Sequence, residues 1–197
     1  MDTIIIGNQE WTTVNSNLKT FRNGDLIPEV KDFEEWRNTK SPACCYYNND
    51  IINSELSGLL YNGHAILDSR NLAPEGFRIP TNDDFVQLIE NMGSEDYGFK
   101  LKTKIKGHWK NMKGVKKGTN ELGFNAFPSG MRTTLWGKAP FVNQNEYTRF
   151  WTVTKKEDLI LFCAQLGYGD DRLYVAAKFH SEARINDGCS LRFIKEN

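Results

Sequence analysis

Four cysteines and three histidines are the side chains in this sequence best able to act as nucleophiles, redox centres or metal ligands. Cys44 and Cys45 are adjacent, which is a poor geometry for a mutual disulfide, and Cys163 lies in the apolar run LILFCA. There is no CxxC motif, and the histidines are scattered at His64, His108 and His180. This spacing does not fit a zinc site. The pattern favours buried free thiols, with a disulfide from Cys189 to Cys44 or Cys45 as the alternative in an exported protein.

Other catalytic groupings are also missing from the sequence. No Ser/His/Asp arrangement stands out, and no glycine-rich loop is present that could cradle a phosphate. We therefore interpret the reactive side chains as parts of the core. The sequence predicts neither an enzyme nor a cofactor or metal.

Two polar and aromatic stretches are better suited to binding than to catalysis. They are LWGKAPFVNQNEYTR and the turn YGDDR, which mix rings with amide, carboxylate and basic groups. Binding surfaces use aromatic anchors together with adaptable polar side chains. The residues predicted to contact a ligand are Trp136, Phe141, Asn143, Asn145, Tyr147, Arg149, Tyr168, Asp170, Asp171 and Arg172. The alternative for both stretches is an ordinary solvated connection.

A third stretch, FKLKTKIKGHWKNMKGVKKG, carries eight lysines and no acidic residue. The alternation at its start predicts an edge strand, in which lysines protect the sheet against edge-to-edge aggregation. The solvated face of that strand would carry Lys100, Lys102, Lys104 and Lys106. The alternative is a patch for an anionic glycan, lipid or nucleic acid, with Trp109 stacking on the ligand. Acidic residues in the preceding segment would weaken the field of such a patch.

The chain length of 197 residues is usual for one domain, and we interpret residues 1–197 as a single domain. Hydrophobic residues make up 39% and charged residues 25%, as in globular proteins. The 25 basic and 25 acidic residues cancel, which argues against a general nucleic-acid or membrane-surface protein. No apolar run approaches the ~20 residues of a membrane span, and TIIIG is too short for the core of a secretory signal.

The scaffold is easiest to predict around PEGFRIPTNDDF. Pro74 and Gly76 favour a turn, and Pro80 ends a short strand because its ring crowds the preceding residue out of the α region. Thr81 can cap a helix that has carboxylates in its first turn, and Gly93 is placed to end it. The apolar face of that helix would consist of Phe85, Leu88, Ile89 and Met92. The stretch is therefore a strand-to-helix corner and needs no catalytic role.

The remaining segments predict helices early and strands late in the chain. TIIIGNQEWTTVN reads as a hairpin that turns at Gly7 and Asn8, and VKDFEEWRN as a short helix. The last third contains short runs rich in β-branched and aromatic residues: NAFPSGMR, RFWTVT, LILFCAQL, RLYVAAKF and SLRFIK. This order indicates an α+β fold rather than alternating α/β.

Several of these segments together resemble the Fibrobacter succinogenes major paralogous domain, a family widespread in bacteria of the Bacteroidetes type. The most specific are GLLYN, PEGFRIPT and GFNAFPSGMR, and the resemblance covers nearly the whole chain. It implies a C-type-lectin-like fold with an antiparallel sheet, two flanking helices, paired terminal strands and long irregular loops on one side. The sequence departs from the family at Phe77 and Phe85, where tryptophan is frequent, and at Ala73, where a cysteine can precede the proline.

The resemblance also implies structural roles for two segments. In GFNAFPSGMR we expect Phe124 and Phe127 to pack in the core and Arg132 to tie loops to backbone carbonyls, since a guanidinium offers several donors in one plane. Trp151 and the residues after it should form a central strand.

Calcium would be the natural cofactor of a sugar-binding lectin with this fold. The available oxygen-bearing side chains are Asn143, Asn145, Glu146, Asp170 and Asp171. However, the Glu-Pro-Asn and Trp-Asn-Asp signatures of calcium-dependent lectins are missing, and Trp151 is followed by Thr-Val. We therefore expect no obligatory calcium.

Formylglycine-generating oxidases share a related fold and an R-x-P-T corner, which RIPT matches here. Their chemistry requires two closely spaced reactive cysteines near the C-terminus, because copper and oxygen activation need thiolate ligands. Cys163 and Cys189 are far apart in the sequence and have apolar neighbours. An oxidase is therefore the least favoured of the functions considered.

These expectations combine into a binding or adhesion module that recognises a glycan or a protein through long loops. The alternative is a structural or receptor-binding component of a virion or an injection machine. Both place the protein outside the cell, on a cell surface or a virion surface, and both allow a homo-oligomer or an assembly partner. Neither nucleic-acid binding nor membrane insertion is expected.

Overall fold

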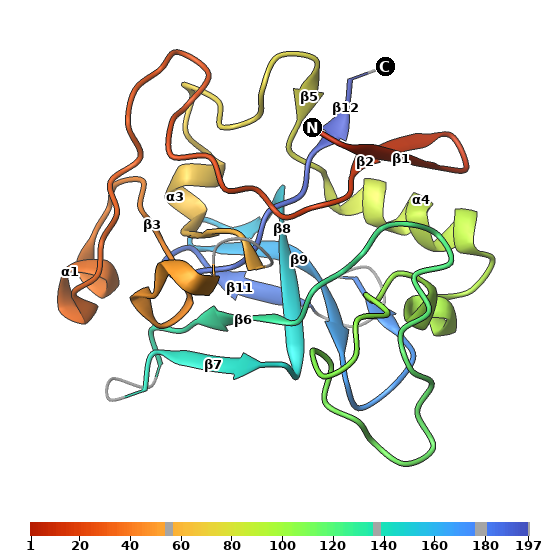
Figure 1. Cartoon of the computed structure of the whole chain (residues 1–197). Helices are drawn as coiled ribbons and strands as arrows, with labels where there is room; N and C mark the ends of the chain where they lie inside the picture. Colours follow the sequence, from red (N-terminus) through yellow and green to blue (C-terminus); the bar gives the residue numbers. More distant parts are fainter. Residues whose placement is uncertain (54–56, 136–138, 176–180, 197) are drawn as a thin grey trace.

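The computed structural model describes residues 1–53, 57–135, 139–175 and 181–196. The chain has a mixed α+β fold, mostly sheet with few helices (Figure 1). The helices are α1 (Phe33–Asn38), α3 (Gly63–Ile66) and α4 (Asn82–Met92), with 3-10 helices η1 (Tyr47–Asn49), η2 (Ile51–Asn53) and η3 (Glu95–Lys100). The strands are β1 (Thr3–Ile6), β2 (Gln9–Thr12), β3 (Cys44–Cys45), β4 (Leu60–Tyr61), β5 (Phe77–Arg78), β6 (Ser129–Arg132), β7 (Phe141–Gln144), β8 (Tyr147–Glu157), β9 (Ile160–Gly167), β10 (Leu173–Tyr174), β11 (Glu182–Arg184) and β12 (Ile194–Lys195).

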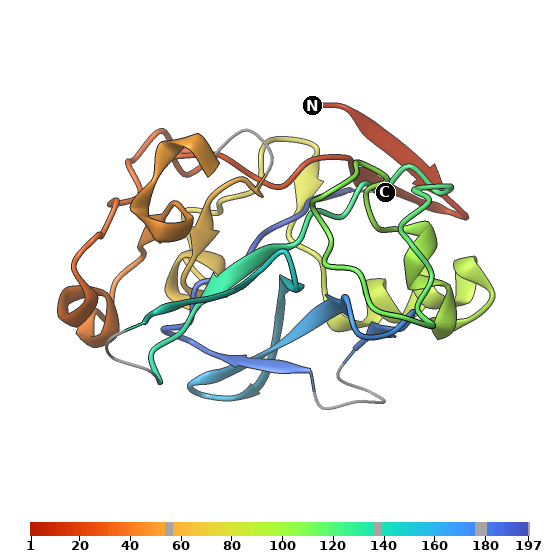
Figure 2. The same ribbon diagram turned by 60° about the horizontal axis from the view of Figure 1, so that its bottom comes forward.

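The larger sheet has the strand order β10-β9-β8-β6-β7, with β11 also paired to β9. Its described ladders are antiparallel except for β6 and β8, which run parallel with Gly130 opposite Thr148. The sheet curls as a half-barrel (Figure 2). Strand β8 lies between β9 and β6, which confirms that Trp151 belongs to a central strand.

The second sheet joins the two ends of the chain, in the order β1-β2-β12-β5. Ile194 of β12 lies opposite Trp11 of β2 in an antiparallel pair, which confirms the pairing of terminal strands. The predicted hairpin is β1 and β2, with Gly7 at a φ of 62° in its turn. The predicted short helix is α1. No helix in the described part of the chain has both the length and the apolar character needed to cross a bilayer.

Helix α4 begins and ends where the sequence predicts. The Thr81 hydroxyl accepts a hydrogen bond from the Asp84 backbone N–H at 3.2 Å, and the Asp84 carboxylate accepts one from the Thr81 N–H at 2.6 Å. Arg78 donates to the same carboxylate at 2.6 and 2.7 Å. Burial works to raise the pKa of Asp84, but the bonds from Arg78 and Thr81 outweigh it and hold that pKa below its ordinary value. Gly93 ends the helix at a φ of 85°. The strand-to-helix corner at residues 78–84 therefore has a structural role.

The core lies on both faces of β8, because successive side chains of a strand point to opposite sides. Phe150 packs with Trp11 and Phe85 beneath α4, and the Phe85 and Phe150 rings stack with centroids 6.2 Å apart. Trp151 points the other way, and its indole N–H donates to the carbonyl of Tyr61 at 2.7 Å. Around Phe150 and Trp151 both faces of this strand are therefore buried. The connecting loops lie at the ends of the strand.

Two fully buried arginines tie irregular segments to this frame. The Arg132 guanidinium donates at 2.7 to 3.0 Å to the carbonyl oxygens of Val30, Lys31 and Asp32, which confirms the expected role. The Arg192 guanidinium donates at 2.6 to 3.0 Å to the side chain of Asn15 and the carbonyls of Thr12, Phe124 and Asn125. Each guanidinium binds several oxygen atoms at once, because it offers several donors in one plane.

Candidate functional site

Residues 101–118, which we call the lysine loop, form a long irregular loop that contains most of the lysine-rich stretch. The prediction of an edge strand at the start of the lysine-rich stretch is wrong. Leu101, Lys102 and Thr103 are buried in succession while Ile105 is 48% exposed, so burial does not alternate along the chain. The base of the loop is closed because Gly118 packs directly on Thr103, where a Cβ at Gly118 would collide with the Thr103 carbonyl oxygen.

Lys102 anchors the lysine loop although it is only 2% exposed. Its ammonium donates to the carbonyl oxygens of Gly167 and Asp170 at 2.6 and 2.7 Å, and lies 5.2 Å from the centre of the Trp109 ring. Burial lowers the pKa of Lys102 to about 8, and the charges of Asp171 and Asp170 oppose this shift. This buried cation joins the loop to the β9–β10 turn.

Two further lysines join the loop to neighbouring turns. The backbone N–H of Lys110 donates to the Asn145 carbonyl at 2.7 Å, and its ammonium pairs with Glu146 at 2.6 Å and lies 4.9 Å from the centre of the Tyr168 ring. The N–H of Lys116 donates to the Asp171 carboxylate at 3.1 Å. We call the surface made by the lysine loop, residues 145–147 and residues 168–172 the loop face. In Figure 1 the lysine loop (green) lies beside the β9–β10 turn (blue) at the lower right.

The loop face contains a pocket of about 290 Å³, which we call the lysine pocket. It is lined by residues 102–107, 109–112 and 115–118 and by Tyr168. Six of these described lining residues are lysines and none is acidic. The apolar contribution comes from Val115 and from Ile105 and Met112, which are 48% and 51% exposed. The pocket therefore combines concentrated positive charge with a small apolar surface.

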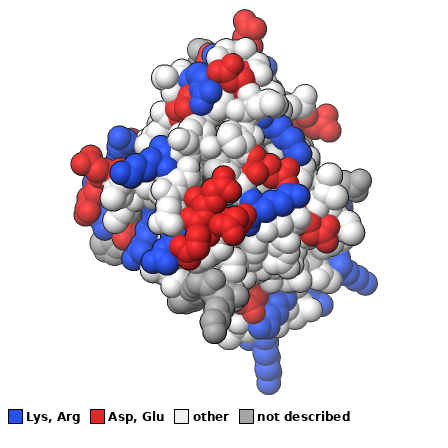
Figure 3. Space-filling view, turned by 90° about the vertical axis from the view of Figure 1, so that its left-hand side faces the viewer, with Lys and Arg blue, Asp and Glu red and all other residues white. Residues whose placement is uncertain are grey.

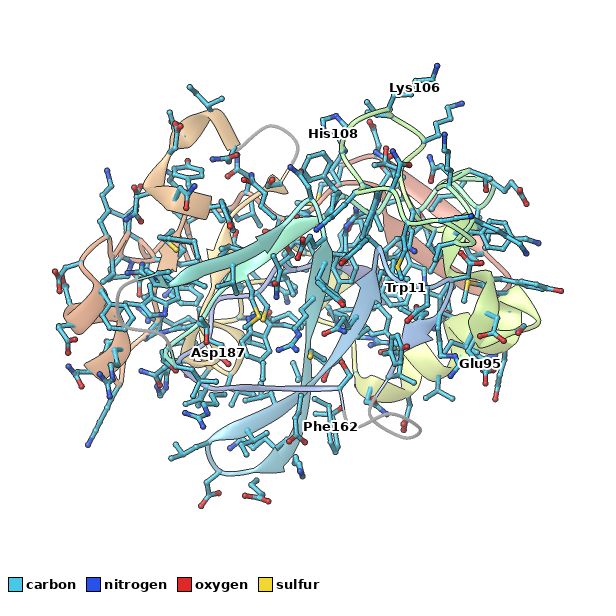
Figure 4. All side chains as sticks on the ribbon, turned by 90° about the horizontal axis from the view of Figure 1, so that it is seen from below. Trp11, Glu95, Lys106, His108, Phe162 and Asp187 are labelled. Carbon is cyan, nitrogen blue, oxygen red and sulfur yellow. The ribbon has the colours of Figure 1, made fainter. Side chains whose placement is uncertain are left out.

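Most lysines of the pocket have no ion-pair partner among the described residues. Lys104, Lys106 and Lys117 are exposed and form no ion pair with a described residue, whereas Lys110 is paired with Glu146. Figure 4 shows Lys106 projecting away from the ribbon at the edge of the loop. The face around α1 differs, because acidic and basic side chains are interspersed there (Figure 3). Lysines without a described ion-pair partner thus gather at the lysine pocket of this neutral protein.

The structure brings several of the predicted ligand-binding residues to the loop face. Tyr147 and Tyr168 contact each other edge to face, with ring centroids 5.9 Å apart. Asp170 accepts a hydrogen bond from the Tyr174 hydroxyl at 2.5 Å, and the Asp171 carbonyl accepts one from the Gly98 N–H at 2.7 Å. Asp170 and Asp171 are therefore used in hydrogen bonds within the protein, and Tyr168 is the predicted residue that lines the pocket.

The remaining predicted residues lie elsewhere or, like Asn145 and Arg172 on the loop face, make contacts within the protein. The Phe141 ring packs on Tyr47, 5.3 Å away, and under Arg132. The Arg149 guanidinium donates to Gln165 at 2.7 Å. Arg172 donates to the Asp96 carboxylate at 2.9 Å, and the Asn143 and Asn145 backbones have left-handed φ angles of 65° and 64°. Trp136 lies outside the described residues. The stretch is thus not one long loop, because residues 141–144 pair with β6 as strand β7.

The sequence did not indicate that the lysine-rich stretch and the YGDDR turn are neighbours, and the structure joins them. The buried position of Lys102 was missed, because its acceptors are carbonyl oxygens some 65 residues further along the chain. The sequence did contain one indication of this site. The lysines around Trp109 have no acidic residues among them, and this pattern supported the alternative of a patch for an anionic ligand.

The cysteines are buried and unpaired. Burial raises the pKa of Cys44 to about 12 and that of Cys45 to about 11, and it also raises the pKa values of Cys163 and Cys189. These thiols stay protonated at neutral pH, while the thiolate is the form that acts as a nucleophile or binds a metal. The described residues contain no group of three histidine, cysteine or acidic side chains placed to hold a metal ion.

The protein thus has a mixed α+β fold, in which sheets and helices support a basic loop face. The chain belongs to the Fibrobacter succinogenes major domain family, whose model matches residues 4–195. The match confirms the resemblance of the sequence motifs to this family. Comparisons with curated proteins and with solved structures found no match. The function is therefore argued from the site.

Proposed function

We propose that the protein is a binding module without catalysis, which recognises a glycan or a protein through the loop face. The observation that carries this proposal is the lysine pocket, which is open to solvent, lined by basic and apolar side chains and anchored at its base by Lys102. Concave sites with a few convergent charged groups are the usual form of a ligand site. Contacts of Lys102, Lys110 and Lys116 with the neighbouring turns hold the loop that forms this pocket.

The state of the thiols supports a function without catalysis. Cys163 and Cys189 are both fully buried, and burial raises their pKa values. An oxidase of the formylglycine-generating type would need thiolates that a substrate and copper can reach. The corner after Arg78 is likewise occupied by structural hydrogen bonds to Asp84.

We also propose that the fold is a branch of the C-type-lectin-like folds and that the protein works on a cell or virion surface. The paired terminal strands, the helices α1 and α4 and the long loops support the fold assignment. A stable frame that presents variable loops suits an adhesion or receptor-binding role outside the cell.

Tyr168→Ala is the variant that tests the proposed function. We expect it to weaken binding to a captured glycan or protein partner about tenfold, because truncating a partly buried aromatic anchor typically costs more than 1 kcal/mol. Tyr168→Phe should keep most of the affinity, since the ring and its contacts with Tyr147 and Lys110 remain. Binding to a glycan array and pull-down with the purified protein would measure this.

Leu159→Ala is the matched control, because Leu159 is 65% exposed in the turn at the opposite end of the β8–β9 hairpin. It should leave binding unchanged. If Leu159→Ala weakened binding as much as Tyr168→Ala, or if neither changed it, the assignment of the loop face would be wrong.

The alternative is a structural component of a virion or injection machine, and one observation favours it. A second hollow of about 590 Å³ is lined by Leu159, Ile160 and Ile185 among others. Leu159 is 65% exposed there, and apolar surface beside a hollow suits an assembly contact. Concentration-dependent self-association in solution, reduced by Leu159→Ala, would support this alternative, and a monomer at all concentrations would argue against it.

A further inference from the structure

We infer that the lysine pocket binds a compact saccharide that carries two or more separate anionic groups, such as sulfates or carboxylates. This inference rests on the proposed function and specifies its ligand. Four features of the pocket narrow the class of ligand. They are the sign of its charge, the use of lysine to supply that charge, the contacts of its aromatic rings and its volume.

The charge of the pocket calls for an anion. Six lysines line about 290 Å³ in a protein whose 25 basic and 25 acidic residues cancel over the whole chain. Lys104, Lys106 and Lys117 lack a carboxylate partner among the described residues. Like charges gathered in this way repel one another, and a bound anion relieves the repulsion.

The choice of lysine over arginine indicates several separate anionic groups. None of the described lining residues is an arginine. A guanidinium grips one planar carboxylate or phosphate with two parallel hydrogen bonds, whereas an ammonium is a compact point charge on a flexible stem. Lysines spread around a rim therefore suit a ligand whose charges are spread over its surface.

The aromatic rings argue against a nucleic acid as the ligand. Single strands gain affinity when bases stack on free aromatic faces. The Lys102 ammonium lies over the Trp109 ring and the Lys110 ammonium lies over the Tyr168 ring, at 5.2 and 4.9 Å. Trp109 also packs against the buried core. A lysine thus covers one face of each ring, which leaves one side of Tyr168 for a small ligand but no row of open rings on which successive bases could stack.

The remaining apolar surface fits the carbon skeleton of a sugar. Ile105, Met112 and Val115 line the pocket with aliphatic groups, and the first two are about half exposed. The pocket lies at the lower limit of small-ligand sites, which are roughly 300–1,000 Å³. A ligand of about the size of a disaccharide fits it, with its anionic groups reaching the lysines at the rim.

Calorimetric titration of the full chain with a sulfated disaccharide tests the inference. The pocket variant is Lys104→Gln/Lys106→Gln/Lys117→Gln. The control variant, Lys40→Gln/Lys113→Gln/Lys155→Gln, removes the same charge from exposed lysines outside the lining, one of them in the same loop. We expect the pocket variant to bind about tenfold more weakly and the control to change by less than about twofold, because three close charge contacts are lost only in the former.

The comparison probes are the unsulfated disaccharide, inorganic sulfate and a single-stranded oligonucleotide. We expect weaker binding of all three than of the sulfated disaccharide, and a loss of affinity for the latter at high salt. Equal loss in both lysine variants, equal affinity for the unsulfated sugar, or tighter binding of the oligonucleotide would overturn the inference. Both variants carry surface changes only, and their melting temperatures should match that of the wild type.

The same proteins separate this inference from the proposed function. Suppose that Tyr168→Ala weakens the binding of a captured partner but the pocket variant binds that partner as tightly as the wild type does. The loop face is then a binding surface, and the anionic saccharide is the wrong ligand. If neither the sulfated disaccharide nor any partner binds in a Tyr168-dependent way, both proposals are contradicted.

Discussion

Arg192→Met is expected to lower the free energy of unfolding by about 3–5 kcal/mol, because several buried oxygen atoms lose their donor at about 1–3 kcal/mol each while the cost of the buried charge is removed. Arg192 is 1% exposed and burial lowers its pKa to about 9, so the folded protein carries a costly cation. Four hydrogen bonds to Asn15, Thr12, Phe124 and Asn125 offset that cost. Methionine fills similar space but leaves these oxygens without a donor in the core.

Urea unfolding followed by tryptophan fluorescence at neutral pH would measure the effect. Arg192→Lys provides a second variant that keeps the charge, and we expect an intermediate loss because one ammonium cannot reach acceptors placed for a planar fork. A loss below about 1 kcal/mol for Arg192→Met would show that the acceptors find other donors, which contradicts the described role.

Lys102→Met is expected to remove a pH dependence of stability that the wild type shows above neutral pH. The folded pKa of Lys102 is lowered to about 8 from an ordinary value of 10.5. Between these values the unfolded chain binds more protons than the folded one, so the stability of the wild type rises with pH in this window and falls as pH drops through 8. The rise is at most about 3 kcal/mol, since one pKa unit corresponds to about 1.4 kcal/mol.

The measurement is the difference in unfolding free energy between wild type and Lys102→Met across this pH range. At pH 7 the variant should be less stable by about 1–3 kcal/mol, because the Gly167 and Asp170 carbonyls lose their donor. Other lysines and tyrosines titrate in both proteins, so their contributions cancel in the difference between the two unfolding free energies. A difference that stays constant across the range would contradict the buried state of this lysine. Lys113→Met, at an exposed position of the same loop, is the control.

The sequence predicted those parts of the fold whose signals are local. The cap at Thr81, the apolar face of α4 and the stop at Gly93 lie within a dozen residues, and the structure confirms each of them. The hairpin of β1 and β2 depends on a short turn, and β8 on a run of aromatic and β-branched residues. In these segments the propensity of the chain and its packing agree.

The lysine loop could not be predicted because its conformation depends on distant partners. Alternation of lysine with apolar residues is the pattern of a strand, yet Lys102 is buried by carbonyl oxygens of Gly167 and Asp170. The turn that supplies them was predicted correctly, but nothing in the sequence indicates that the two segments meet. Tertiary contacts thus override the local pattern here.

The candidate site was predicted only in part for the same reason. Tyr147 and Tyr168 were expected on one side of the molecule, and their rings do meet. Phe141 and Arg149 were expected with them, but the register of the larger sheet places Phe141 against Tyr47 and Arg149 against Gln165. Which side of a strand a residue faces depends on pairing, and the pairing of β7 with β6 was not visible in the sequence.

The most direct test of the loop face as a binding surface is a map of amide chemical-shift changes in the labelled protein as the sulfated disaccharide is added. We expect changes concentrated in residues 101–118 and 168–172, with Tyr168 and Lys104 among the largest, and none in the corner at Arg78 or in the turn at Leu159. Saturable changes centred on Leu159, or no saturable change within residues 101–118, would contradict this expectation.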